Sequence, residues 1–237
     1  MHFSRFLMAT ALISSSALAA GKATSSKGLD KSSYSLGYQF GQNLHNLDAQ
    51  INMDSFTKGF ADALAGKAGA LSKEEMQKTM AEFESNLRSK MDSKKREQGD
   101  KNVKEGKAFL EANAKKPGIK VLPSGLQYKV ITEGSGQSPK AADVVKTHYR
   151  GTLISGKEFD SSYARKEPAE FPVNGVIKGW TEALQLMKPG AKWQLFIPSD
   201  LAYGPQGAGA DIGPNATLIF EVELLAVKNS EQGKTTR

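Results

Sequence analysis

The residues best able to create a binding site in this 237-residue chain are aromatic and apolar rather than charged. In the stretch GVIKGWTEAL (175–184), Trp180 comes directly after a Val-Ile-x-Gly sequence and begins a short amphipathic pattern. Ala183, Leu184 and Met187 share a helical face with this tryptophan, because they follow it at helical spacing. Two interpretations remain open at this point: the indole packs in a core, or it forms the floor of an apolar pocket.

Other kinds of chemistry have little support. The chain has no cysteine and three histidines, of which His2 falls in a predicted N-terminal leader. His45 lies in a helical pattern and His148 on the strand face opposite Tyr149, so neither has an evident partner at metal-ligand spacing. The sequence contains no G-x-S-x-G motif, and the glycines of 204–214 match no phosphate-binding pattern. We therefore expect no metal and no cofactor, and we interpret 204–214 as a flap beside a sheet.

The elements that position Trp180 are short strands. Five alternating runs follow Pro117, separated by turns rich in Gly, Pro, Asp and Ser: 126–131, 144–153, 170–173, 191–198 and 216–227. The helical pattern around Trp180 interrupts them once, which predicts a small antiparallel sheet with one short helix over its apolar face. By alternation, Tyr149 and Phe220 point to the same core as the helix. Trp180 is therefore expected to have aromatic neighbours.

The preceding residues, 28–116, have helical periodicity. Two short segments come first, over 31–47 and 53–66, and they carry aromatic stripes made of Tyr34, Tyr38, Phe40, Phe56 and Phe60. So few residues bury too little surface for a strong core of their own. We therefore predict a C2 homodimer in which a second copy covers these stripes, with methionines at the start of the next helix completing the contact.

That next helix is predicted to be unusually long. Ser72 and Glu75 form a capping box, and helical composition continues to about residue 115. The stretch 93–107 is polar all round, which is typical of a helix that bridges domains. Gly99 and Gly106 each cost about 1 kcal/mol relative to alanine. We expect the polar stretch to hold the sheet away from the dimer core and to flex at these glycines.

Residues 1–20 have the three-part layout of a secretory signal: a basic start, an apolar run and small residues with an A-x-A site at Ala17–Ala19. The alternative is a frayed N-terminal helix of the mature fold. The signal predicts export to the periplasm or to the outer membrane or cell surface, with no integral membrane segment in the mature chain. The formal charge of +7 comes from basic residues scattered among acids, which does not indicate nucleic-acid binding.

Four linked motifs in the strand half resemble the FKBP-type peptidyl-prolyl isomerases: YRGTLISGKEFDSS, VIKGWTEAL, LAYG and IGPNATLIFEVELL. The resemblance covers residues 117–228, and the helical first half with its leader resembles the dimeric, exported Mip-like branch of Gram-negative bacteria. It implies an α+β fold: a helical N-terminal dimerisation region, a long connecting helix and a C-terminal antiparallel half-barrel sheet around a short helix. The implied segments are 1–20 signal peptide, 21–71 dimerisation region, 72–116 connecting helix, 117–228 isomerase domain and 229–237 flexible tail.

The resemblance also implies an aromatic pocket for a proline ring. Its walls and floor would be Tyr149, Phe159, Phe220 and Trp180, with Val176 and Ile177 at one flank, Ile212 at the far edge and Tyr203 offering its hydroxyl from the flap. The Ile177 N–H would bind a substrate carbonyl. Asp160 would sit beside the pocket, held by Tyr149 or Arg165, although an ordinary turn residue in FDSS is the alternative. For Trp193 we expect plain packing.

The implied activity is cis-trans isomerisation of Xaa-Pro bonds in exported or extracellular proteins, assisting their folding and extending to host interaction. The implied partners are proline-containing polypeptides, macrolide inhibitors and a second copy of the chain. The alternative is a dimeric chaperone whose pocket clamps clients while isomerisation is incidental. Three positions depart from the commonest pattern, Ala169, Gly175 and Ala208, and they predict a more open pocket.

Overall fold

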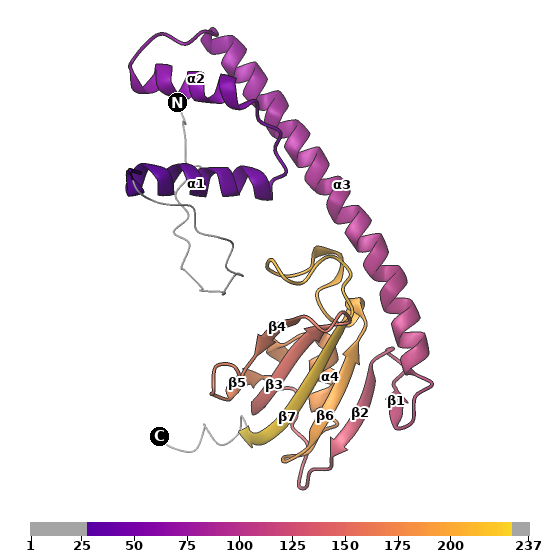
Figure 1. The fold of residues 1–237 in the computed structure, drawn as a ribbon. Coiled ribbons are helices and arrows are strands. Elements are labelled where there is room, and N and C mark those ends of the chain that lie inside the picture. The colour runs from indigo at the N-terminus through magenta and orange to yellow at the C-terminus, as the bar shows by residue number, and fades with distance from the viewer. Residues whose placement is uncertain (1–27, 229–237) are drawn as a thin grey trace. The chain divides into compact units, whose positions relative to one another are not determined.

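The computed structural model describes residues 28–228 (Figure 1). The expected signal peptide and the expected tail, 229–237, lie outside the described residues. The chain divides into two compact units between Gly69 and Ala70. The first unit contains two short helices, and the second contains one long helix and a sheet. Within residues 28–228, no helix has both the length and the apolar character needed to cross a bilayer.

The first unit consists of two short helices, α1 (Lys31–Asn46) and α2 (Met53–Leu64). Asp30 and Asn52 begin them as N-caps, each accepting a hydrogen bond from a backbone N–H three residues on. The rings of Phe40 and Phe56 stack with centroids 5.6 Å apart and join the two helices. Neither helix contains a buried residue. This unit therefore carries apolar faces without enclosing a core.

The second unit begins with α3 (Lys73–Asn113), a continuous helix of 41 residues. The Ser72 hydroxyl accepts from the Glu75 N–H, and the Glu75 carboxylate accepts from the Ser72 N–H. These reciprocal bonds satisfy two N–H groups that have no partner inside the helix. The predicted capping box and the predicted long helix are both confirmed.

A seven-stranded antiparallel sheet follows, in the order β1-β2-β6-β7-β3-β4 with β5 paired to β3. Its strands are β1 (Ile119–Val121), β2 (Gln127–Thr132), β3 (Val144–Leu153), β4 (Glu158–Ser161), β5 (Ala169–Pro172), β6 (Lys192–Ile197) and β7 (Leu218–Lys228). Figure 1 shows the sheet curving around the short helix α4 (Lys178–Leu184). The predicted α+β fold, with a helical first part, a long helix and an antiparallel sheet around a short helix, is confirmed.

Two strands, β1 and β4, were not among the five predicted runs. β1 has three residues, and β4 contains a single apolar residue followed by Asp and Ser, which are typical of turns. β4 matters most for the site, because it carries Phe159 and Asp160. It pairs with β3 across a register shift between Gly151 and Thr152.

The core lies between α4 and the concave face of the sheet. Trp180, Ala183 and Leu184 of α4 are buried against inward residues of β3, β6 and β7. Gly179 allows this close approach, because a Cβ there would lie 2.6 Å from a methyl carbon of Ile197. Trp193 is buried on the same face of the sheet and stacks on Tyr128 with centroids 4.3 Å apart, as expected of a packing residue.

The second half of α3 packs on the sheet, so the expectation of a polar spacer that flexes at its glycines is wrong there. Gly99, Gly106 and Asn113 are buried. A Cβ at Gly106 would lie 2.3 Å from Thr217 Oγ1, and the ring of Phe109 lies 6.0 Å from that of Phe196. The helix buries its backbone here rather than an apolar stripe. The glycines are therefore points of close contact with the sheet.

A buried amide pair fixes the end of α3. Asn113, 1% exposed, donates through Nδ2 to Gln127 Oε1 at 3.0 Å, and Gln127 Nε2 donates to the Leu110 carbonyl at 2.9 Å. The Gln127 side chain thus links β2 to two positions of the last helical turn. Without the Asn113 side chain, the buried Oε1 atom of Gln127 would lose its hydrogen-bond donor.

We therefore expect Asn113→Ala to lower the free energy of unfolding of this unit by about 1–3 kcal/mol. Urea unfolding followed by tryptophan emission measures it, because both tryptophans, Trp180 and Trp193, lie in the sheet unit. Asn86→Ala is the matched control at an exposed position of the same helix. Equal midpoints for the two variants would contradict this role of Asn113.

Candidate active site

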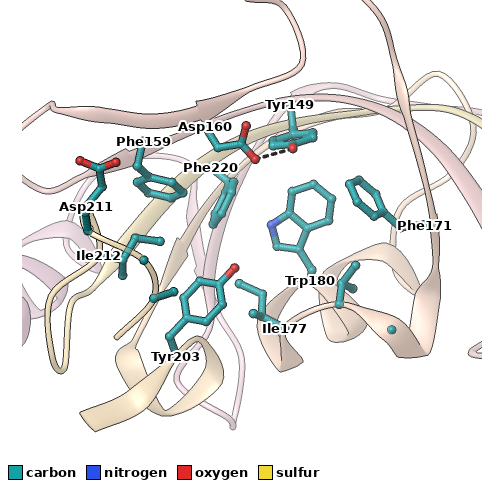
Figure 2. Close-up of a pocket in the computed structure, with 15 residues that line it drawn as sticks. Tyr149, Phe159, Asp160, Phe171, Ile177, Trp180, Tyr203, Asp211, Ile212 and Phe220 are labelled. Carbon is teal, nitrogen blue, oxygen red and sulfur yellow. Dashed lines mark hydrogen bonds between the residues drawn. The ribbon is translucent and has the colours of Figure 1, made fainter. Parts of the chain in front are cut away.

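A pocket of about 630 Å³ opens on the concave side of the sheet, between α4, β3, β4, β5, β7 and the flap 204–214 (Figure 2). It is lined by Tyr149, Phe159, Asp160, Phe171, Gly175, Val176, Ile177, Trp180, Tyr203, Ala208, Gly209, Ala210, Asp211, Ile212 and Phe220. All the predicted site residues line this pocket except Arg165, which is not a lining residue but binds Asp160. Among residues 28–228, no group of three or more His, Asp or Glu side chains is arranged to hold a metal ion.

Trp180 forms the floor of this pocket and is also a core residue, so the two interpretations of this tryptophan hold together. Its side chain is 4% exposed. The indole meets the rings of Tyr149 and Phe220 at 5.3 Å and that of Phe171 at 5.9 Å, in each case edge to face. Such contacts are the preferred geometry for aromatic rings. The floor is therefore held from three strands at once.

Gly151 makes room for the wall on the β4 side. A Cβ at this position would lie 2.6 Å from the ring of Phe159 and 2.8 Å from that of Phe220. Phe159 can therefore cross the edge of β3 and meet Phe220 edge to face, with centroids 5.5 Å apart. The glycine of the YRGTL motif thus has a steric role in shaping the pocket.

Phe171 is a wall residue that the sequence analysis missed. It lies on β5 opposite Val145 of β3 and contacts both Tyr149 and Trp180. From the sequence, the run EFPV predicts only a strand. Alternation could have placed Phe171 at the pocket, because Phe171 and Val173 share a face and Val173 is fully buried. Of the three departures from the common pattern, Gly175 and Ala208 line the pocket, and Ala169 does not.

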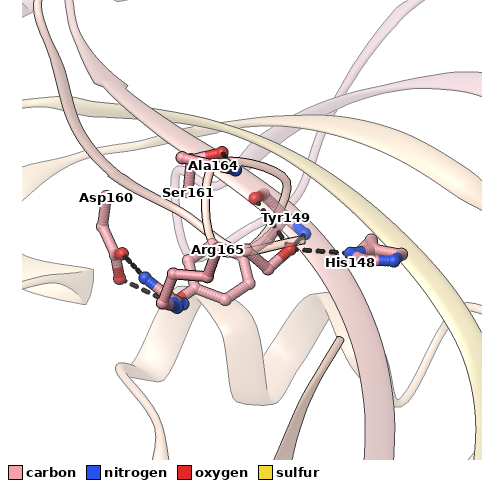
Figure 3. A network of polar contacts seen from close by, with 7 residues as sticks. His148, Tyr149, Asp160, Ser161, Ala164 and Arg165 are labelled. Carbon is pink, nitrogen blue, oxygen red and sulfur yellow. Dashed lines mark hydrogen bonds and ion pairs between the residues drawn. The ribbon is translucent and has the colours of Figure 1, made fainter. Parts of the chain in front are cut away.

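One polar cluster borders the apolar pocket (Figure 3). The Tyr149 hydroxyl donates to Asp160 Oδ2 at 2.5 Å, and Arg165 donates to both Asp160 Oδ1 and, at 2.7 Å, the Tyr149 hydroxyl. The sequence predicts either Tyr149 or Arg165 as the hydrogen-bond partner of Asp160, and in the structure both bind it. The carboxylate is thereby fixed at the mouth of the pocket.

The charge state of this cluster follows from its contacts. Burial alone would raise the pKa of Asp160, but the hydrogen bonds from Tyr149 and Arg165 outweigh burial and lower that pKa below its ordinary value of 3.8. Burial and the hydrogen bond to Asp160 raise the pKa of Tyr149. At neutral pH, Asp160 is therefore a carboxylate and Tyr149 a neutral phenol. The stabilisation from the ionised Asp160 is complete above pH 3.8 and is lost as pH falls through the lower folded-state pKa.

His148, for which the sequence suggested no partner, has two. Its Nδ1 lies 2.9 Å from Ser162 Oγ, and its ring stacks on Tyr163 with centroids 4.7 Å apart. The buried Ser162 hydroxyl also accepts from the Tyr149 N–H at 2.8 Å. Ser162, the last residue of the FDSS motif, thus fixes the backbone behind Tyr149. No pattern in the sequence predicts that this serine positions Tyr149.

Two further polar groups belong to residues that line the pocket, one just before α4 and one at the start of the flap. Ile177 precedes α4, and within the described residues its N–H donates no hydrogen bond. Tyr203 is 41% exposed and stands at the start of the flap, with its hydroxyl directed toward the pocket (Figure 2). At the outer rim, Lys157 Nζ donates to Asp211 Oδ1 at 2.7 Å and links the β3–β4 turn to the flap.

Comparison with known families gives two matches that run through most of the chain. A family described as FKBP-type peptidyl-prolyl cis-trans isomerase matches residues 135–225. The domain amino terminal to FKBP-type peptidyl-prolyl isomerase matches residues 29–130. The first match contains the whole pocket, and the second contains α1, α2 and α3.

Individual relatives cover nearly the whole chain. It is 46% identical over 220 residues to the outer membrane protein MIP of Legionella longbeachae, covering 92% of this chain and 94% of that protein. It is 46% identical over 199 residues to the peptidyl-prolyl cis-trans isomerase Mip of Coxiella burnetii, covering 84% and 86%. The crystal structure of FkpA from Escherichia coli matches with a TM-score of 0.68 at 42% identity, covering 86% and 99%. With both family matches and these relatives, the chain belongs to the FKBP-type peptidyl-prolyl cis-trans isomerases, in their Mip/FkpA-type branch.

Proposed function

We propose that this isomerase acts by holding the proline ring of an Xaa-Pro substrate against Trp180, with the twisted imide inside the aromatic walls. Rotation about the peptide bond has a barrier of about 18–20 kcal/mol because resonance is lost at the twisted geometry. A twisted imide has less charge separation than a planar one, so water favours the planar form. An apolar pocket that removes this water lowers the barrier selectively. The observation that carries the proposal is the set of three edge-to-face aromatic contacts that hold Trp180 at the floor of the pocket.

Three polar groups would then position the substrate chain. The Ile177 N–H, just before α4, and the Tyr203 hydroxyl, at the start of the flap, would donate to two substrate carbonyls. Asp160 is already occupied by Tyr149 and Arg165, so it acts as a fixed charge beside the imide rather than as a proton donor. No covalent intermediate is required, because only a torsion changes.

The proposed clients are proline-containing chains outside the cytoplasm. The proposal is supported by the signal-like residues 1–20 and by the printed name of the Legionella relative, an outer membrane protein. Residues 1–20 are removed in this scheme, and an intact Met1 on protein recovered from the cytosol would contradict it. Assistance to folding follows from the activity. Client clamping by paired chains is the second candidate, favoured by the exposed apolar faces of α1 and α2.

Asp160→Asn tests the role of the fixed charge. We expect kcat/KM for an Xaa-Pro peptide to fall about ten-fold, because the amide keeps the shape and loses the charge. Exchange spectroscopy on a peptide with an apolar Xaa measures the rate. Glu158→Gln is the matched control, since this exposed carboxylate lies on the same strand and pairs with Arg150 outside the pocket. Equal values of kcat/KM for the two variants would show that the charge of Asp160 does not contribute to catalysis. A wild-type rate equal to the uncatalysed rate would contradict the activity itself.

Macrolide inhibitors of this family are proposed to bind over Trp180. We expect such a ligand to change tryptophan emission in the wild type and in Trp193→Phe, because Trp193 stacks on Tyr128 and is not among the residues lining the pocket. The change should disappear in Trp180→Leu. The measurement is a fluorescence titration. Calorimetry confirms that the ligand still binds in a variant whose emission does not change. A ligand signal that depends on Trp193 instead would place the ligand elsewhere.

A homodimer is proposed to form through the faces that α1 and α2 leave uncovered. Tyr34, Tyr38 and Phe60 are each more than half exposed, and neither helix has a buried residue. We expect a dimer in sedimentation equilibrium for the wild type and a monomer for Phe60→Glu, because a charge cannot be buried unpaired in an apolar contact. Ser55→Glu, at an exposed position on the opposite side of α2 from Phe60, is the control and should remain dimeric. A wild-type monomer, or a dimeric Phe60→Glu, would overturn this arrangement.

A further inference from the structure

The flap 204–214 supplies one side of the pocket, and its two ends are tied together at their base. The Asn215 N–H donates to the Gly204 carbonyl at 2.8 Å. Inside the flap, Ala208 and Ile212 exchange two backbone hydrogen bonds, of 2.8 and 3.1 Å. Tyr203 directly precedes this closed loop, and Ile212 lies within it. A shift of the base would therefore move both side chains relative to Trp180.

The side chain of Asn102 in α3 forms a hydrogen bond with this base. Asn102 Nδ2 donates to the Pro214 carbonyl at 2.7 Å. Gln98 Nε2 donates to Asn102 Oδ1 at 2.8 Å, which fixes the orientation of the Asn102 amide. Figure 1 shows the second half of α3 running past the sheet. Asn102 lies outside the pocket itself.

The glycines of α3 and of the flap bring the two backbones close enough for this bond. A Cβ at Gly99 would lie 3.3 Å from Asn215 Nδ2, and a Cβ at Gly213 would lie 3.4 Å from Asn102 Nδ2. Asn215 itself has a φ of 55°, in the left-handed region that few side chains adopt. The base of the flap is thus a tightly packed, conformationally specific junction with the connecting helix.

We infer that Asn102 is a positioning residue for the isomerase reaction. It acts through the Pro214 carbonyl and sets where the flap places Tyr203 and Ile212 over a bound chain. The inference rests on the proposed use of these two residues in substrate binding. The connecting helix thereby becomes part of the machinery that binds substrate, at a site remote from the aromatic floor.

Asn102→Asp in the full chain tests this role. The aspartate keeps the size of the side chain and the acceptor for Gln98, but it puts an oxygen in place of the donor to Pro214. We expect KM for an Xaa-Pro peptide to rise about five-fold, the usual effect of one hydrogen bond, while kcat changes less than two-fold. The amide resonances of Ala208 and Ile212 should shift in the free protein. Asn86→Asp makes the same chemical change at an exposed position of α3 and should match the wild type in all three measurements.

Two results would overturn the inference. Unchanged KM and unchanged flap resonances in an active Asn102→Asp protein would show that the bond does not position the flap. A fall in kcat with unchanged KM, together with a lower melting temperature, would show that Asn102 only stabilises the fold. A wild type without catalysis would instead refute the proposed function, so the two failures are distinguishable.

Discussion

The contact on which the structure depends is the burial of the Trp180 indole under three rings set edge to face. Each ring comes from a different strand: Tyr149 from β3, Phe171 from β5 and Phe220 from β7. Such pairs contribute about 0.5–1.5 kcal/mol each beyond the area that they bury. The floor of the pocket and the core of the fold are therefore one set of contacts. A rigid, apolar floor of the pocket results directly from stable packing.

The sequence predicted those parts of the molecule whose residues repeat with a clear period. Alternation placed Tyr149 and Phe220 inward and located five strands, and the spacing after Trp180 located α4. The resemblance to a known family, rather than periodicity, assigned roles to Asp160, Ile177 and Tyr203. Those roles stay proposals. β4 could not be predicted from pattern because its one apolar residue, Phe159, is followed by Asp and Ser, which are typical of turns. Its tight crossing over Gly151 depends on contacts between strands.

The packing of α3 could not be predicted for a different reason. A helix that is polar all round normally faces solvent, because it lacks an apolar stripe. α3 packs without one, by burying backbone at Gly99 and Gly106 and by pairing the amides of Asn113 and Gln127. The residues that contact Gly99 and Gly106 lie far along the chain, at 214–217, so no local signal marks those contacts. Glycines that look like weak points in isolation are sites of close approach in the folded unit.

The pairing of β3 with β7 determines when the pocket forms during folding. The two strands lie side by side, with Gly151 opposite Phe220, although β4, β5, α4 and β6 come between them in sequence. Closing so long a loop is entropically costly and makes such topologies slow to fold. Until β7 is added, Tyr149 has no neighbouring strand on that side and Trp180 lacks one of its three covering rings. A chain that folds from its N-terminus onward therefore has an incomplete pocket until β7, the last strand of the described residues, has paired with β3.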